Sequence, residues 1–403
     1  MGNSSIEELA VFGGKPVFEK PLYVGRPNIG DRDLFFKYLN DILERRWLTN
    51  NGQYVQEFQR KLASMIGVKH CIVMCNATIA LEIVIRALGM TGEVIVPSFT
   101  FIATAHSLQW QQITPVFCDI EPETNCLDPI AVEKMITPRT TGIIGVHVWG
   151  RPCNVEALTE IARRRGLKLL FDAAHALGCS YKGEMIGRFG DAEVFSFHAT
   201  KFFNTFEGGA ITTDNDELAE KIRLMKNFGF SRTSYDDVIY IGTNGKMSEV
   251  SAAMGLASLE RINEFIDVNY NNYLTYKKEL TGIHGIRLIN HNENERNNYQ
   301  YIIIEIDELV TRISRDNIVK ILHAENVRAR RYFYPGCHQM EPYKSYFPHA
   351  RLLLPRTEYL ARRVISLPNG TAVSSEDISE ICRIIRLAAA NGPEIQKKLN
   401  AAD

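Results

Sequence analysis

Short apolar runs alternate with helical patterns from residue 70 onward, and this alternation restricts the fold more than any other feature. The runs typical of buried strands are residues 70–74, 94–96, 116–119, 142–147, 167–171 and 192–195. Helical periodicity occurs between them, up to residue 88 and again at residues 101–110 and 155–165. Because strands that alternate with helices form parallel sheets covered on both faces, we predict an α/β fold with a mostly parallel central sheet.

The 403 residues are enough for two domains, and the pattern changes near residue 250. One long helix is expected at residues 250–280, followed by a strand at 301–306 and by helices at 315–325, 357–364 and 375–389. The last dozen residues are polar and alanine-rich, which is typical of a frayed helix or tail. We therefore expect a large domain at residues 1–250, which begins with an irregular arm, and a smaller α+β domain at residues 251–403.

Composition argues against several classes of protein. The net charge is −1 with both signs dispersed, which is not the charge pattern of a nucleic-acid-binding protein. No apolar run reaches the roughly 18 residues of a membrane span, and residues 1–8 lack the features of a signal peptide. The eight cysteines form no CxxC pair, so we expect a reduced, cytoplasmic protein without a metal site.

A single lysine, Lys201, lies between the run at 192–195 and another apolar run at 210–213. Its neighbours in the sequence are the phenylalanines Phe197, Phe202, Phe203 and Phe206. If these rings also surround the amine, the loss of water lowers the pKa of the lysine and makes it a nucleophile. The alternative is a lysine that extends from a hydrophobic hairpin into solvent.

Other polar and aromatic residues fall at or near the carboxyl ends of predicted strands: Asn76, Phe101, His147 and Asp172. Parallel sheets bind their ligands at that edge. Thr78 begins a helix there, where backbone N–H groups can bind phosphate, although Thr78 also fits a simple N-cap. A lysine, a carboxylate, an aromatic plane and a phosphate cradle together are the parts of a pyridoxal phosphate site.

Several longer blocks of the sequence resemble blocks of a known protein family. They are Thr100-Phe101, Asp172-Ala-Ala-His-Ala176, Phe189-Gly-Asp191, Ser196-Phe-His-Ala-Thr-Lys201, Glu207-Gly-Gly209, Asn227-Phe-Gly229 and Gly242-Thr-Asn-Gly-Lys-Met-Ser-Glu249. In this order, from about residue 27 to the C-terminus, the chain resembles the DegT/DnrJ/StrS family of sugar aminotransferases. The resemblance implies the type I fold of pyridoxal-phosphate-dependent aminotransferases and a homodimer with both active sites at the interface.

The resemblance also implies roles for residues around the cofactor, pyridoxal 5'-phosphate, which becomes pyridoxamine 5'-phosphate in the half-reaction. Lys201 would bind the cofactor covalently and carry the proton, and Asp172 would pair with the ring nitrogen. His175, at a position where the family often has Gln, would contact the ring hydroxyl, and Phe101 would stack on the ring.

The phosphate would be held by Ala77, Thr78 and Ser196. Here the chain has Asn-Ala-Thr where many members have Gly-Thr, so a glycine is lost but the threonine is kept. Asn227, Asn244 and Lys246 would reach in from the partner subunit.

The blocks are most similar to the members that aminate C4 of dTDP-4-keto-6-deoxy-D-glucose with L-glutamate as donor. The residues that would bind this substrate are Arg26, Thr49, Lys246, Arg330, Arg331, Tyr332 and His338. Arg330 and Arg331, with Lys246, would neutralise the diphosphate, since the guanidinium fork suits phosphate oxygens. The alternative is that one of these two arginines merely flanks the solvated end of a strand and binds no substrate.

Four other functions stay open. The first is amination at C3 of the 3-keto isomer, and the second is a sugar dehydratase of the same fold, in which His replaces the lysine. A short-chain nicotinamide oxidoreductase is suggested by the Tyr-x-x-x-Lys pair of Tyr273 and Lys277, but no glycine-rich fingerprint follows an early strand. The last is a non-catalytic protein that retains the fold.

Overall fold

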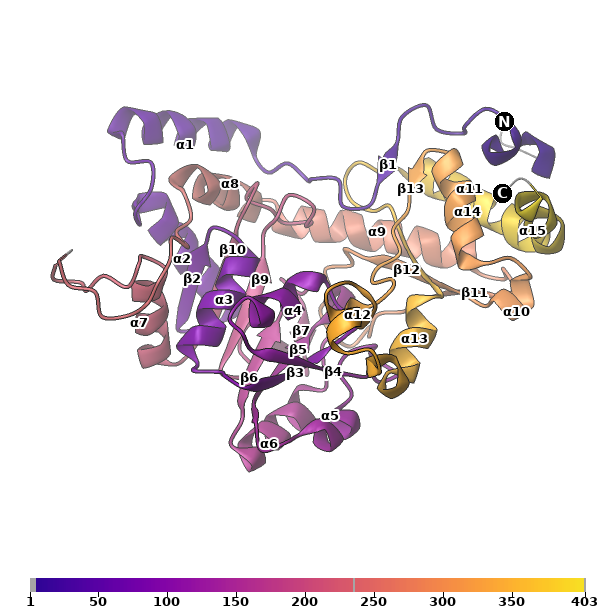
Figure 1. Cartoon of the computed structure of the whole chain (residues 1–403). Helices are drawn as coiled ribbons and strands as arrows, with labels where there is room; N and C mark the ends of the chain where they lie inside the picture. Colours follow the sequence, from indigo (N-terminus) through magenta and orange to yellow (C-terminus); the bar gives the residue numbers. More distant parts are fainter. Residues whose placement is uncertain (1–4, 235, 402–403) are drawn as a thin grey trace.

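A seven-stranded sheet forms the centre of the molecule in the computed structural model, which describes residues 5–234 and 236–401 (Figure 1). The strands, in their order across the sheet, are β2 (His70–Met74), β10 (Gly209–Thr213), β9 (Ala192–Ser196), β6 (Lys168–Asp172), β5 (Thr140–Val146), β3 (Glu93–Pro97) and β4 (Thr114–Cys118). Only β10 runs antiparallel to its neighbours within this sheet. The prediction of an α/β fold with a mostly parallel sheet is therefore confirmed.

Alternate residues of these strands enter two different hydrophobic clusters, as the period of two in a strand requires. Ile72, Leu170 and Val194 belong to a cluster with helices α3, α4 and α7, whereas Val73 and Phe195 belong to one with α2 and α8. The sheet is therefore covered by helices on both faces.

The helices of the first 260 residues mostly begin where the sequence predicts. Their bounds are α1 (Arg32–Arg45), α2 (Gln53–Ile66), α3 (Ala77–Ala87), α4 (Ile102–Gln109), α5 (Pro129–Met135), α6 (Val155–Arg165), α7 (Asp216–Met225) and α8 (Glu249–Leu259). Side chains of Asp31, Asn76, Asn154 and Asn215 cap the helices that follow them, which fixes where each helix begins.

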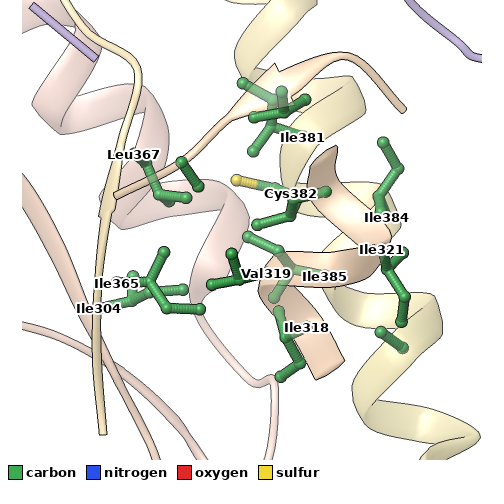
Figure 2. Packing of buried hydrophobic residues seen from close by; sticks show 14 of the residues in the cluster. Ile304, Ile318, Val319, Ile321, Ile365, Leu367, Ile381, Cys382, Ile384 and Ile385 are labelled. Carbon is green, nitrogen blue, oxygen red and sulfur yellow. The ribbon is translucent and has the colours of Figure 1, made fainter. Parts of the chain in front are cut away.

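The second part of the chain builds a three-stranded sheet of β11 (Ile286–Leu288), β12 (Ile302–Ile306) and β14 (Val364–Leu367). Its helices are α9 (Ile262–Leu280), α10 (Glu308–Thr311), α11 (Arg315–Ala324), α12 (Tyr343–Tyr346), α13 (Pro355–Ala361), α14 (Ser375–Ala390) and α15 (Gly392–Asn400). Figure 2 shows the core between them, where Ile304 and Ile365 of the sheet pack with side chains of α11 and α14. Two small two-stranded pairings complete the structure: β1 (Leu22–Tyr23) with β13 (Val327–Arg328), and β7 (Ser180–Tyr181) with β8 (Glu184–Met185).

The single helix predicted at 250–280 is wrong, because the structure has α8 and α9 with a break at Arg261 (φ −116°, ψ 9°). α8 is buried on most sides between α1, α2 and the first sheet, whereas α9 presents one face to the second core. Neither Pro nor Gly marks the break, so periodicity alone cannot locate it.

Two details of the predictions near the C-terminus are also wrong. The helix expected at 357–364 is present as α13 but ends at Ala361, and Val364 instead begins β14, which pairs with β12. Residues 392–400 are not a frayed tail: they form α15, which buries Ile395 and Leu399 in the second core.

Packing across residue 250 bears on the proposed division into residues 1–250 and 251–403. α8 contacts α1 and α2 of the first part, whereas Ile6, Leu9 and Leu22 from the N-terminal arm lie in the second core. The arm and the C-terminus accordingly lie at the same end of the molecule (Figure 1). We keep the two-domain division as a proposal, with the arm on the smaller part.

Within the described residues, no helix combines the length and the apolar character needed to cross a membrane. The expectation that the chain lacks a signal peptide concerns in part residues 1–4, which lie outside the described range.

Candidate active site

A cavity of about 600 Å³ opens at the carboxyl ends of the central strands. Asn76 follows β2, Phe101 lies shortly after β3, and Asp172 and Ser196 end β6 and β9. On the opposite side the cavity is lined by Tyr301, Arg330, Tyr332 and Phe333 from the second part of the chain. The strand-end residues that the sequence predicts to lie together are therefore brought together, except His147, which is not among the lining residues.

Lys201 reaches this cavity from the loop between β9 and β10. Its Nζ donates a hydrogen bond of 3.2 Å to the hydroxyl of Tyr301. Burial lowers the pKa of Lys201 to about 8, and the nearby Asp172 carboxylate acts in the opposite direction. At pH 7 the neutral fraction of this amine, which can act as a base or nucleophile, is therefore much larger than that of an exposed lysine.

The phenylalanines near Lys201 in the sequence do not surround its amine, so that part of the prediction is wrong. Phe197 and Phe203 pack against Phe58 in the core, with ring centroids 5.8 Å and 6.1 Å from that ring. Phe206 is 46% exposed. The residue that contacts the amine is instead Tyr301, which lies 100 positions along the chain.

Asp172 is buried at the end of β6 and its two carboxylate oxygens are held in place. Oδ2 accepts a hydrogen bond from the Thr104 hydroxyl at 2.8 Å, and Oδ1 accepts one from the Ala174 backbone N–H at 3.1 Å. Burial raises the pKa of Asp172, while the Thr104 and Ala174 bonds lower it. A cationic group in the cavity would offset the cost of burying this carboxylate.

His175 lines the same cavity as a neutral ring. Burial lowers its pKa well below the ordinary value, and the Lys201 charge lowers it further. The Trp149 backbone N–H donates to Nδ1 at 3.2 Å, so the ring proton lies on Nε2. The ring stacks with Phe333, with a centroid distance of 5.8 Å, and its centroid lies 4.5 Å from that of Tyr301. These contacts fix the orientation of His175.

The N-terminus of α3 forms one wall of the cavity. Asn76 caps this helix by accepting from the Ile79 N–H at 2.8 Å. The first N–H groups of a helix have no partner within it, and those of Ala77 and Thr78 lie in the cavity wall. Gly209 lies so near that a Cβ atom there would be 2.8 Å from the Ala77 nitrogen. The backbone is thus arranged as a cradle for an anion, with Ser196 in the same wall.

Phe101 lies at the N-cap of α4 and is 57% exposed, with part of its surface in the cavity lining. Its position leaves room for a flat ligand.

Asn227, Asn244 and Lys246 are not in this cavity. The Lys246 Nζ donates to the Asn227 Oδ1 at 2.9 Å, and Asn227 pairs with Asn244 through a β-bridge. Asn227 and Lys246 line a second cavity of about 520 Å³, together with the cations Arg223, Lys226 and Arg232. Within one chain, these residues are therefore separate from Lys201.

The predicted substrate-binding residues divide into two groups. Arg330 and Tyr332 line the Lys201 cavity. Arg331 instead donates to Asp316 at 3.0 Å, with its guanidinium over the Tyr334 ring. Neither Arg331 nor His338 is brought into the cavity lining.

His338 is held at both ring nitrogens, by Ser98 at 2.6 Å and by Glu358 at 2.8 Å, so it has no ring nitrogen left for a ligand. Arg26 and Thr49 are exposed outside the cavity lining.

Asn28, two residues after Arg26, is buried and serves the structure. Its Nδ2 donates to the Phe202 carbonyl at 2.9 Å, and its Oδ1 accepts from the Thr371 backbone N–H at 3.1 Å and from the Thr371 hydroxyl at 2.8 Å. Asn204 in turn donates to the Asn28 carbonyl at 2.9 Å. Asn28 therefore joins the Lys201 loop to the second part of the chain.

Three residues that contact the predicted site residues escaped sequence reasoning. Thr104, Tyr301 and Phe333 contact Asp172, Lys201 and His175 respectively. Thr104 lies three residues after Phe101 in a predicted helix, so its approach to a strand end was in principle readable. Tyr301 and Phe333 come from a different sheet and a loop, for which no local pattern gives the contact.

Tyr273 and Lys277 do not form a catalytic pair. The Tyr273 hydroxyl donates to Asn290 at 3.2 Å, and Lys277 pairs with Glu293 at 2.8 Å on the outside of α9. Among the residues that the structure describes, no group of three or more His, Cys, Asp or Glu side chains is placed to hold a metal ion.

Comparisons with known proteins agree on one family. The family model described as "DegT/DnrJ/EryC1/StrS aminotransferase family" matches residues 30–386. The chain is 39% identical over 370 residues to dTDP-4-amino-4,6-dideoxy-D-glucose transaminase from Shigella dysenteriae, covering 91% of this chain and 99% of that protein. It is 36% identical over 310 residues to GDP-perosamine synthase from Caulobacter vibrioides, covering 76% and 83%.

A solved structure gives the same result. The crystal structure of DesI in the presence of its TDP-sugar product superposes with a TM-score of 0.94 at 48% identity. The match covers 98% of this chain and 100% of that one, so the fold is shared along the whole length.

Proposed function

Because this chain belongs to the DegT/DnrJ/EryC1/StrS aminotransferase family, we propose that it transfers the amino group of L-glutamate to C4 of dTDP-4-keto-6-deoxy-D-glucose. The product is dTDP-4-amino-4,6-dideoxy-D-glucose, the compound named in the Shigella dysenteriae relative. The observation that carries the proposal is that Lys201 and Asp172 line one cavity together with Ala77 and Thr78 at the N-terminus of helix α3.

Pyridoxal phosphate, the cofactor that the family implies, fits the donor set of this cavity. A buried amine of lowered pKa, a buried carboxylate with room for a cationic partner, and an anion cradle lie around a single space of about 600 Å³. The close approach of Gly209 to Ala77 makes the cradle possible. When bound, the cofactor supplies an electron sink for the carbon atom whose proton is moved.

The residues of this chain then have distinct tasks. Lys201 binds the cofactor and moves a proton at its Nζ, and Asp172 holds a proton on the ring nitrogen through its buried carboxylate. Ala77, Thr78 and Ser196 hold the phosphate. Phe101 would pack on the cofactor ring, and His175, whose proton is on Nε2, would contact the ring hydroxyl.

We also propose a homodimer in which Asn227, Asn244 and Lys246 complete the cavity of the partner. The support is that all three residues lie outside the Lys201 cavity of their own chain, and that Asn227 and Lys246 line the second cavity together with several cations. Several exposed apolar side chains are close in sequence to the residues that line this cavity. They lie on α1 and in the loop after α7: Phe36, Leu43, Val238, Ile239 and Ile241. A surface of this kind is typical of a contact between subunits.

For the nucleotide sugar, Arg330 and Tyr332 are the residues with most support, because they line the cavity. Lys246 of the other subunit would add a positive charge for the diphosphate. Arg26 and Thr49 remain in the proposal as exposed residues that a second subunit or a long substrate can reach. Arg331 and His338 have structural partners, which argues against a substrate contact in this conformation.

The proposed compartment is the cytoplasm. All eight cysteines are free in the structure, and most are buried, which is the usage typical of a reducing environment.

The test is a substrate panel with the purified full-length protein and L-glutamate. dTDP-4-keto-6-deoxy-D-glucose should be aminated, and NMR of the product should place nitrogen at C4. The 3-keto isomer, the GDP-linked 4-keto sugar and the 4-keto sugar without nucleotide are the other arms, the GDP arm because GDP-perosamine synthase is a relative. Lys201→Ala is the control and should give no product. Amination only at C3, or only of the GDP-linked or free sugar, would contradict the proposal.

A further inference from the structure

The hydroxyl of Tyr301 is the contact that the Lys201 amine makes in this structure. In the part of the chain that is described, it is the acceptor within hydrogen-bond distance of Nζ, at 3.2 Å. Tyr301 immediately precedes β12 and is only 6% exposed. The hydrogen bond therefore joins a loop of the central sheet to the residue just before a strand of the smaller sheet.

The position of Tyr301 is fixed from several sides. Its ring contacts His175 at 4.5 Å and Tyr332 at 6.3 Å, and it belongs to a hydrophobic cluster that also contains Ile303 and Phe333. Ile303 lies in β12, two residues after Tyr301, so the ring packs in the same core as that strand. A hydroxyl on such a ring has little freedom to move away from the amine.

Among the described residues, the Lys201 amine has no second hydrogen-bond partner. The Nδ1 of His175 accepts from Trp149, and the Asp172 carboxylate, which can accept further hydrogen bonds, receives them here from Thr104 and Ala174 and not from Lys201. Lysine has a long, flexible side chain, and an amine with no fixed partner samples many positions. A single well-placed acceptor therefore decides where this amine resides when it is not bonded to another group.

We propose that Tyr301 is a positioning residue: its hydroxyl holds the Lys201 amine in the cavity during the part of the reaction in which that amine is not bonded to the cofactor. This inference rests on the proposed function. The held amine stays where it can take up and return a proton, instead of turning toward solvent.

The chemistry of the hydroxyl suits this task in both protonation states of the lysine. Burial raises the pKa of Tyr301 well above its ordinary value, so the phenol keeps its proton. It can accept a hydrogen bond from the ammonium group or donate one to the neutral amine. The bond from the charged group is the stronger of the two, so the hydroxyl favours the protonated lysine.

The variant Tyr301→Phe tests the inference, because it removes the hydroxyl and keeps the ring packing. The full-length enzyme is first treated with glutamate, which frees the lysine amine, and Lys201 is then labelled with a trace of acylating reagent over a pH series. Peptide mass spectrometry follows the labelling. The midpoint for Lys201 should fall by about one pH unit in the variant, a tenfold change in proton affinity. kcat should fall roughly tenfold with KM for the sugar unchanged, as expected for the loss of one hydrogen bond to a charged group.

Tyr299→Phe is the matched control, since it removes a hydroxyl two residues away that lies outside the cavity lining. It should leave the Lys201 midpoint and kcat unchanged, and both variants should unfold within a few degrees of the parent protein. An unchanged midpoint in Tyr301→Phe overturns the inference. So does a rise in KM with kcat intact, which would make Tyr301 a substrate contact.

The two proposals fail in different ways. A protein that binds no pyridoxal phosphate refutes the proposed function and with it the role of Tyr301 in a reaction. A protein that binds the cofactor and turns over, but whose Lys201 labelling is insensitive to Tyr301→Phe, refutes only the inference about Tyr301.

Discussion

Two opposing influences set the proton affinity of Lys201. Burial lowers its pKa from 10.5 to about 8, although the Asp172 carboxylate favours the charged form. Between pH 8 and 10.5 the unfolded chain therefore binds a proton on this lysine that the folded chain does not. The cost of burying the amine is fully present below pH 8, and stability rises as the pH increases through that window. The site accepts a loss of stability in return for a reactive amine.

Covalent capture of pyridoxal phosphate by Lys201 should follow the same pKa. The capture rate of the cofactor-free chain should rise about tenfold per pH unit and level off above pH 8, because only the neutral amine reacts. Lys201→Ala and Lys201→Arg should show no capture, since a guanidinium stays protonated. Borohydride reduction followed by peptide mass spectrometry measures the adduct.

Lys226 is an internal competitor in this experiment. Burial lowers its pKa to about 8 as well, but it lies in the second cavity, where its Nζ donates to the Val73 carbonyl at 3.3 Å. An adduct found mainly on Lys226, or one that persists in Lys201→Ala, would contradict the assignment of Lys201.

At this scale the sequence predicted part of the site and missed part for a clear reason. Lys201, Asp172 and Thr78 follow strands or begin a helix, and strand ends of a parallel sheet meet at one edge. The aromatic neighbours of Lys201 were misassigned because adjacent residues point in different directions: Phe197 and Phe203 pack in the core. The true neighbour, Tyr301, depends on how a second sheet packs, which no local pattern contains.

At the scale of elements, boundaries were predictable where local signals set them. Helices with a capping side chain, such as α3 and α6, begin within a residue or two of the expected positions. The division between α8 and α9, the strand β14 and the docking of α15 all depend on tertiary packing. Val364-Ile-Ser-Leu367, for example, is apolar enough for either a helix or a strand, and pairing with β12 decides the outcome.

The contact between β10 and the start of α3 leads to a prediction for Gly209→Ala. The added Cβ would lie 2.8 Å from the Ala77 nitrogen and 2.9 Å from the Asn76 carbonyl carbon, so the helix start must move. We expect pyridoxal phosphate affinity to fall by about tenfold or more, since the cradle depends on backbone N–H positions. Fluorescence or absorbance titration of the cofactor measures the loss.

Gly142→Ala is the matched control for this substitution. It also adds a methyl group to a strand of the central sheet, but its nearest contact, at 2.9 Å, is the flexible end of Met90. Cofactor affinity should be retained in this variant. Equal losses in both variants would mean that Gly209 acts through general stability rather than through the cradle.

At the scale of the whole molecule, the separation of Lys201 from Asn227 and Lys246 makes subunit complementation a direct test. Lys201→Ala and the double variant Asn227→Ala/Lys246→Ala should each be nearly inactive alone. After subunit exchange in equal amounts, half of the dimers are mixed and each mixed dimer has one intact site, so about a quarter of the parental activity should return. A coupled assay of glutamate consumption measures it.

The control mixes Lys201→Ala with Asp172→Asn. Lys201 and Asp172 line the same cavity within one chain. A mixed dimer could contain a site with neither change only if these two residues came to each site from different chains. With the proposed sharing, each site takes Lys201 and Asp172 from one chain, and this mixture should stay inactive. Activity in the control would contradict the assignment of Lys201 and Asp172 to one chain, and no activity in the test mixture would contradict shared sites.

The hydrogen bonds of Asn28 have a consequence for the engineering of new sugar specificity in this enzyme. A randomised library built over residues 25–28 would treat two unlike positions as equals. Arg26 is exposed and free to vary, but an apolar replacement of the buried Asn28 leaves the Phe202 carbonyl without this donor and the Thr371 N–H without this acceptor. Most members of such a library would be lost to misfolding before their specificity was ever screened, so diversity belongs at Arg26, Arg330 and Tyr332, with Asn28 left untouched.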